Sequence, residues 1–189
     1  MKTVIGLAGS GRKGSFNAAL LAAAARIEVP DFRIEVATIR GIPLYDGDIE
    51  REQGIPDVVT ALKERIAASD GLFMVTPEYN SGVPGVFKNA IDWLSRPDKD
   101  IARVFGDKPV GLIGATPGRA GTRLSQSARL PTVRTLGLHP GFGKQLYVAS
   151  AGQVFDANGE LVDATIEKLL TQYVRGFAAF VARHSPAAQ

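Results

Sequence analysis

The residues best suited to bind a ligand lie in a glycine-rich segment, residues 9–14, with the sequence Gly-Ser-Gly-Arg-Lys-Gly. This sequence matches the G-x-G-x-x-G pattern of dinucleotide-binding loops. Four residues in or just after the segment can donate side-chain hydrogen bonds to an anion: Ser10, Arg12, Ser15 and Asn17. Dinucleotide loops bind a pyrophosphate mainly through glycine backbone and a helix N-terminus, so this excess of side-chain donors favours a terminal monophosphate.

This segment has two other possible roles, a nucleoside-triphosphate loop and a simple helix cap. The order Lys13-Gly14-Ser15 reverses the Gly-Lys-Ser order of a nucleoside-triphosphate loop, which excludes that class of site. A purely structural interpretation stays open, in which Ser15 caps a helix while Arg12 and Lys13 are solvated. Helix capping and anion binding use the same geometry, so the segment alone does not separate them.

A second polar segment, residues 76–85, has the sequence Thr-Pro-Glu-Tyr-Asn-Ser-Gly-Val-Pro-Gly. Pro84 suits the first position of a helix, where its missing N–H costs nothing. The turn before it offers backbone edges and aromatic or amide faces to a planar heteroaromatic ring. Tyr79 or Asn80 would lie against a face of that ring. The alternative is that this segment only builds a turn and that its carboxylate is solvated.

A third segment, residues 115–123, contains Thr116, Gly118 and Arg119 and follows a further apolar run. We expect Thr116 and Gly118 to approach the same ligand. Arg119 either attracts an anionic substrate or is solvated. The chain has only two histidines and no cysteine, so no metal site is predicted.

The elements that must position these segments alternate between strands and helices. Apolar runs predict strands at residues 3–8, 34–39, 71–76, 110–115 and 145–149. Helical periodicity predicts helices at residues 16–26, 56–68, 84–94, 122–136 and 163–183. This alternation is typical of a doubly wound α/β fold, and five strands suit a flavodoxin-like parallel sheet with helices on both faces. The ligand then belongs at the carboxyl ends of the strands, where the three polar segments lie.

Composition narrows the function further. A chain of 189 residues with 45% hydrophobic content predicts a single domain over residues 1–189, with a frayed tail from about residue 184. The net charge of +3 is spread along the chain, so a small anionic ligand is favoured over nucleic acid. The absence of cysteine and of a long apolar run predicts a cytoplasmic protein without a membrane span. Asp92, Arg96 and Arg129 are candidates for ion pairs between subunits.

Two motifs together resemble one enzyme family. They are Gly9-Ser10 with Arg12, Ser15, Phe16 and Asn17, and the longer pair Thr76–Asn80 and Pro84–Arg96. The chain resembles the NADPH-dependent FMN reductases, more narrowly their bacterial quinone and chromate reductase branch. The similarity runs from Val4 to about Val181. Gly11 departs from the pattern, because relatives often carry a larger apolar residue there, and Pro117 and Arg119 make the third segment atypical.

The resemblance implies a flavodoxin-like fold that binds FMN noncovalently, in a homodimer or homotetramer with the flavin near a subunit boundary. By position, the FMN phosphate would be held by Ser10, Arg12, Ser15, Phe16 and Asn17. The ring and ribityl chain would be lined by Pro77, Glu78, Tyr79, Asn80 and Gly82, with Thr116 and Gly118 nearby. NADPH or NADH would transfer a hydride to N5 of FMN, and a quinone, flavin, azo compound or metal oxyanion would take the electrons. No catalytic side chain is then required.

Two rival functions fit parts of the sequence. A flavodoxin-type electron carrier shares the fold, but such carriers tend to be acidic whereas this chain is basic. An NADP-binding Rossmann protein is the other rival, with Arg40 as a candidate partner for a 2′-phosphate.

Overall fold

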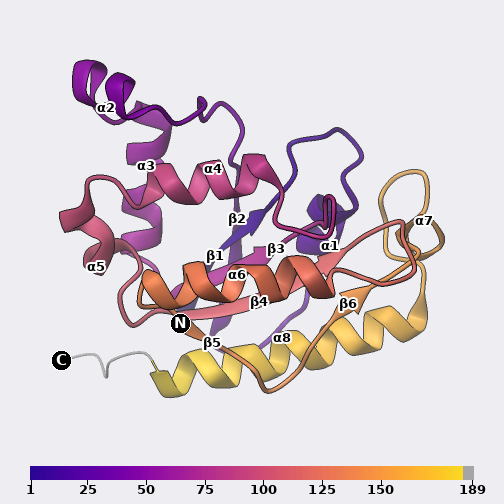
Figure 1. The fold of residues 1–189 in the computed structure, drawn as a ribbon. Helices are drawn as coiled ribbons and strands as arrows, with labels where there is room; N and C mark the ends of the chain where they lie inside the picture. Colours follow the sequence, from indigo (N-terminus) through magenta and orange to yellow (C-terminus); the bar gives the residue numbers. More distant parts are fainter. Residues whose placement is uncertain (185–189) are drawn as a thin grey trace.

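A single parallel sheet forms the centre of the computed structural model, which describes residues 1–184 (Figure 1). The strands are β1 (Lys2–Ala8), β2 (Phe32–Ala37), β3 (Gly71–Val75), β4 (Pro109–Ala115), β5 (His139–Pro140) and β6 (Tyr147–Val148). Their order is β2-β1-β3-β4-β5, with β6 also paired to β4. This is the order of a flavodoxin-like sheet, so the predicted fold class is confirmed.

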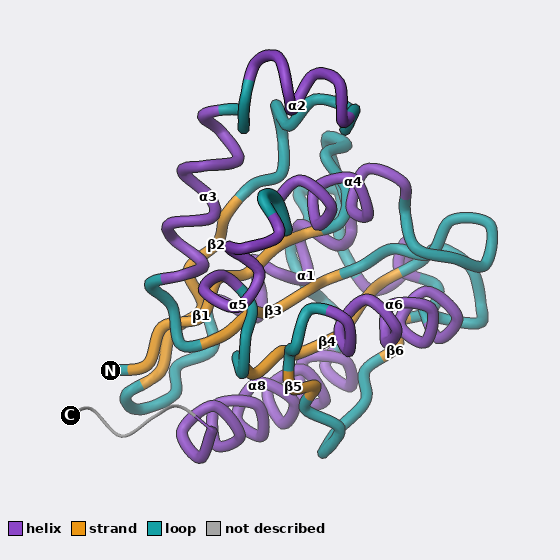
Figure 2. Tube along the Cα trace, turned by 60° about the vertical axis from the view of Figure 1, so that its left-hand side comes forward, coloured by secondary structure: helices purple, strands orange, loops and turns teal. Residues whose placement is uncertain are grey.

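Helices cover both faces of the sheet (Figures 1 and 2). One face is covered by α1 (Phe16–Ala25), α7 (Ala151–Val154) and α8 (Ala164–His184). The other is covered by α3 (Asp57–Ala67), α4 (Gly85–Leu94), α5 (Ile101–Val104) and α6 (Arg123–Thr135). Neighbouring strand residues divide between the faces: Val4 and Phe73 pack in the first core, Ile5 and Leu72 in the second. Burial on both faces explains why the strands read as continuous apolar runs.

The five predicted helices match α1, α3, α4, α6 and α8 to within one residue at each end. The first four predicted strands match β1 to β4 to within two residues. Four short helical segments were not predicted: α2 (Gly47–Gln53), the 3-10 turn η1 (Asp98–Asp100), α5 and α7. The predicted frayed tail concerns residues 185–189, which lie outside the described residues, while His184 is the last residue of α8.

The fifth strand predicted over residues 145–149 is present only as the two residues of β6, and β5 was not predicted. Two strands of two residues take its place: β5 pairs with the start of β4 and β6 with its end. Between them, residues 141–146 leave the edge of β4. The Tyr173 hydroxyl of α8 fills the gap, because it accepts a hydrogen bond from the Leu112 N–H at 2.8 Å and donates one to the Leu112 carbonyl at 3.1 Å.

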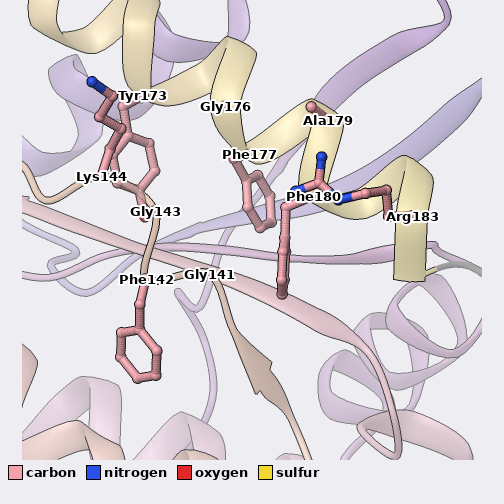
Figure 3. A pocket seen from close by; sticks show the side chains of 10 residues that line it. All are labelled: Gly141, Phe142, Gly143, Lys144, Tyr173, Gly176, Phe177, Ala179, Phe180 and Arg183. Carbon is pink, nitrogen blue, oxygen red and sulfur yellow. The ribbon is translucent and has the colours of Figure 1, made fainter.

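A cavity of about 360 Å³ lies where the chain leaves the sheet (Figure 3). Phe177 and Phe180 extend from α8 toward residues 141–143, while the Phe142 ring points away from the helix. Because β5 pairs with the amino end of β4, this cavity lies away from the carboxyl ends of the strands. The predicted ligand site is therefore a different place.

The expectation of an ion pair between subunits is wrong for Arg129. Its side chain is 1% exposed, and its guanidinium lies 4.1 Å from the centre of the Phe87 ring in the same chain. Asp92 pairs with Lys88 one turn earlier in α4. Arg96 pairs with Glu50 at 2.8 Å and with Asp98.

Among residues 1–184, no helix combines the length and apolar character needed to cross a bilayer.

Candidate functional site

Three loops meet at the carboxyl edge of the sheet, after β1, β3 and β4 respectively. Backbone hydrogen bonds fix where each loop begins. The Gly9 N–H donates to Val75 at 2.8 Å, and the Thr76 N–H donates to Ile113 at 2.9 Å. Since β1, β3 and β4 are neighbours in the sheet, all the predicted ligand residues gather at this edge.

The first loop ends in a capped helix start. Ser15 is the N-cap of α1, and its hydroxyl accepts the Ala18 N–H at 3.3 Å. Ser10 accepts the Arg12 N–H at 3.4 Å. Each serine hydroxyl still has its O–H to donate, and the first N–H groups of α1 have no partner within the helix. The structural role of Ser15 and an anion-binding role are therefore compatible.

Arg12 adds a positive charge to this helix start. Its guanidinium donates to the Lys13 carbonyl at 3.0 Å and lies 5.8 Å from the centre of the Phe16 ring. Phe16 in turn stacks on Phe155 with the ring centres 5.9 Å apart. Within residues 1–184, Arg12 forms no ion pair with a carboxylate. Its charge is thus available to an anion.

The side chain of Asn17 forms its hydrogen bonds within the protein. The amide donates to the Ala115 carbonyl at 2.8 Å and accepts the Ala115 N–H at 2.9 Å, and the residue is 3% exposed. Both ends of the amide are therefore committed to the end of β4. Asn17 ties the helix start of the first loop to the third loop, and its backbone N–H is the group left to face an anion.

The second loop is a tight hairpin turn. Tyr79 and Gly82 exchange two backbone hydrogen bonds, at 3.2 and 3.0 Å. Asn80 and Ser81 between them have φ angles of 49° and 60°, which is a type I′ turn. Asparagine tolerates this left-handed conformation, while Ser81 stands where glycine is usual. The turn presents the Tyr79 side chain, which is 47% exposed, at the carboxyl edge of the sheet.

Glu78 and Pro77 anchor this turn. One carboxylate oxygen of Glu78 accepts the N–H groups of Leu124 and Ser125 at 2.9 and 3.0 Å, so it caps the start of α6. The negative charge also complements the positive end of the helix dipole. Pro77 is buried, and its carbonyl accepts the Thr76 hydroxyl at 3.0 Å. The Glu78 side chain therefore links the second loop to the start of α6 and is not a solvated acid.

The third loop is tied to β6 and α7. The Thr116 N–H donates to Val148 at 3.0 Å, and the Gly118 carbonyl accepts the Ser150 N–H at 3.0 Å. Pro117, Gly118 and Arg119 are exposed. The loop therefore has a fixed base and an open tip beside the other two.

The glycines of the loops test whether a flavin nucleotide fits. A Cβ at Gly82 or Gly118 would meet nothing closer than 3.7 Å, and neither glycine has a positive φ. The fold itself therefore does not require glycine at these positions, whereas a ring lying against the backbone would. The phosphate end fits as well, because a helix start, two hydroxyls and the unpaired Arg12 suit a dianion.

A comparison with protein families identifies the family of this chain. The family model of the NADPH-dependent FMN reductases matches residues 2–153. The chain belongs to this family. The FMN and NAD(P)H cofactors and the oxidoreductase class expected from the sequence are thereby confirmed.

Individual members of the family are similar over nearly the whole chain. An NAD(P)H-dependent FMN reductase of Pseudomonas aeruginosa is 40% identical over 180 residues, which are 95% of each chain. A 2-hydroxy-1,4-benzoquinone reductase of a Burkholderia species is 38% identical over 92% of each chain. The solved structure of FerB, an NAD(P)H:acceptor oxidoreductase of Paracoccus denitrificans, has a TM-score of 0.86 and 30% identity. The match covers 98% of this chain and 100% of the FerB chain.

In this FMN reductase the site extends beyond the predicted residues. A cavity of about 650 Å³ runs from the first loop to residues 152–160, and Arg40 lines it together with Arg12 and Lys13. The segment 152–160 was not predicted to lie near the first loop, because it follows the last strand and not one of the three strands whose loops form the site. The sequence assigns Arg40 a role only in the rival Rossmann interpretation.

Proposed function

We propose that this FMN reductase oxidises NAD(P)H and passes the electrons to a quinone. The observation that carries the proposal is the meeting of three loops of complementary chemistry: an anion-binding helix start, an exposed aromatic turn and an open glycine loop. The benzoquinone reductase among the relatives supports a quinone as acceptor. When bound, FMN supplies the hydride and electron chemistry.

The protein's own residues bind and orient. Ser10, Arg12, Ser15 and the backbone N–H of Phe16 and Asn17 would hold the phosphate. The turn from Pro77 to Gly82, with Tyr79 exposed, would line the ring from one side, and Thr116 and Gly118 would approach it from the other. No side chain has to exchange a proton with the substrate, and substrate positioning is the chief contribution of the chain.

We also propose a homodimer or homotetramer in which a second copy covers the edge of the site. Three large apolar side chains are exposed around it: Tyr79 at 47%, Val86 at 56% and Leu124 at 53%. They belong to the second loop, the start of α4 and the start of α6. Light scattering of the purified protein, with Val86→Glu and Leu124→Glu as disruptive variants, measures the assembly; a monomeric wild type would contradict it.

The finer assignments are proposals of the same kind. Chromate and other metal oxyanions are proposed as further acceptors, because the basic surface attracts small anions. The cytoplasm is proposed as the location. Of the two rivals, a flavodoxin-type carrier would bind FMN without oxidising NAD(P)H. A Rossmann protein would bind the dinucleotide without FMN.

The experiment is an acceptor panel on FMN-loaded protein. Oxidation of NADPH and NADH is followed with benzoquinone, free FMN, an azo dye and chromate. Turnover that is fastest with the quinone supports the proposal. Bound FMN without turnover on any acceptor would leave the electron carrier as the better function.

A further inference from the structure

Three unpaired cations lie together beside the proposed phosphate site. Arg12, Lys13 and Arg40 line the cavity of about 650 Å³, and none of them forms an ion pair with another described residue. Arg26 lines the same cavity but pairs with Glu160 at 2.7 Å. With the helix start and Arg12 assigned to the phosphate of FMN, two cations remain.

The side chain of Arg40 lies beside Gly11. A Cβ at Gly11 would lie 3.5 Å from Cγ and 3.9 Å from Nε of Arg40. The stem of Arg40 therefore lies directly over Gly11, and the further carbons of a larger side chain would compete for that space. Gly11 has no positive φ, so the turn itself does not require glycine. Its small size serves Arg40, which follows β2 at the edge next to β1.

The charge of the cavity lining indicates the ligand. Its basic residues are Arg12, Lys13, Arg26 and Arg40, against the carboxylates Asp156 and Glu160. Asp156 accepts the N–H groups of Asn158 and Glu160 within its own loop, at 2.9 and 2.8 Å. The excess positive charge thus lies on the side of the first loop. A second phosphate next to that of FMN matches it.

We propose that Arg40 and Lys13 form a second anion subsite that takes the 2′-phosphate of NADPH, so that the enzyme prefers NADPH to NADH. This inference rests on the proposed function, since it assigns the phosphorylated coenzyme as the hydride donor of that site. Arg40 offers a forked pair of donors to the phosphate, and Lys13 adds a second charge. Gly11 provides the room that the Arg40 stem requires.

Binding of coenzyme fragments tests the subsite without turnover. FMN-loaded protein is titrated with 2′,5′-ADP and with 5′-AMP by calorimetry. We expect 2′,5′-ADP to bind at least about tenfold more tightly, as one charge-assisted contact requires. Arg40→Gln should remove most of this difference, and Gly11→Leu should reduce it. Arg26→Gln is the matched control, because Arg26 lines the same cavity but is already paired, and it should leave the ratio unchanged.

Kinetics then separate this proposal from the proposed function. In Arg40→Gln, kcat/KM should fall about tenfold for NADPH and stay within about twofold for NADH, with FMN affinity unchanged. Equal affinity for the two nucleotides in the wild type would overturn the subsite, even where NAD(P)H is oxidised. Loss of FMN affinity in Arg40→Gln would also overturn it, by assigning Arg40 to the phosphate of FMN. A retained preference for 2′,5′-ADP without any NADPH oxidation would uphold the subsite and contradict the proposed function.

Discussion

Replacing Asn17 by alanine tests how the phosphate loop is held in place. The buried amide satisfies both the N–H and the carbonyl of Ala115, at 2.9 and 2.8 Å. Alanine leaves both backbone groups buried without that partner. Each such group costs about 1–3 kcal/mol, so we expect Asn17→Ala to lower the free energy of unfolding by about 2–6 kcal/mol. This is a large fraction of the roughly 5–15 kcal/mol that stabilises an ordinary domain.

The assay is urea-induced unfolding of the FMN-free protein, followed by circular dichroism. Asn17→Asp is the informative second variant, because its carboxylate still accepts the Ala115 N–H but cannot donate to the carbonyl. Asn158→Ala, at an exposed asparagine, is the control and should stay within about 0.5 kcal/mol of the wild type.

Binding of FMN and of riboflavin by the same variants separates the two possible roles of Asn17. If the amide were a direct phosphate ligand, Asn17→Ala would weaken FMN binding alone and leave stability within about 0.5 kcal/mol of the wild type. That result would refute the reasoning. A loss of stability with weaker binding of both flavins is what the observed contacts predict.

The observed contacts predict the effects of three further substitutions on FMN binding and on stability. Arg12→Ala should weaken FMN binding by about 1–3 kcal/mol and leave riboflavin binding unchanged, which flavin fluorescence quenching measures; equal effects on both flavins would contradict a phosphate contact. Tyr173→Phe should lower the free energy of unfolding by about 1–3 kcal/mol, because Leu112 loses its partner at the gap in the sheet; no change in the urea midpoint would show that water replaces the hydroxyl. Burial lowers the pKa of Arg129 to about 10, and two of its nitrogens lack partners among the described residues, so Arg129→Met should raise the free energy of unfolding by about 1–3 kcal/mol; a loss of stability instead would show that the contact of the guanidinium with the Phe87 ring outweighs the cost of burying the charge.

Most of the fold could be predicted because the buried strands and amphipathic helices carry their own periodicity. The helices begin and end at residues with clear local signals, such as Ser15 before α1 and Pro84 before α4. The split of the fifth strand carries no such signal. It depends on Tyr173, some thirty residues later in the chain, whose hydroxyl replaces a strand neighbour. The segment α2 has no buried residue and is fixed by contacts such as that between Glu50 and Arg96.

The candidate site could be predicted as a place but not in its internal contacts. The polar segments after three strands had to meet at one edge, since the sheet is parallel. Which polar side chains form hydrogen bonds within the protein depends on tertiary contacts, which the local sequence does not show. Asn17 and Glu78 have the right chemistry to bind a ligand, yet Asn17 is bonded to the backbone at the end of β4 and Glu78 to the backbone at the start of α6. Gly11 and Arg40 are far apart in sequence, so their contact could not be read from either motif.

Anaerobic titration of the FMN-loaded protein with NADPH tests the central claim most directly. We expect the yellow absorbance of the bound flavin to be lost with about one equivalent of NADPH and to return when benzoquinone is added. Bound FMN that keeps its oxidised absorbance in excess NADPH and excess NADH would contradict it.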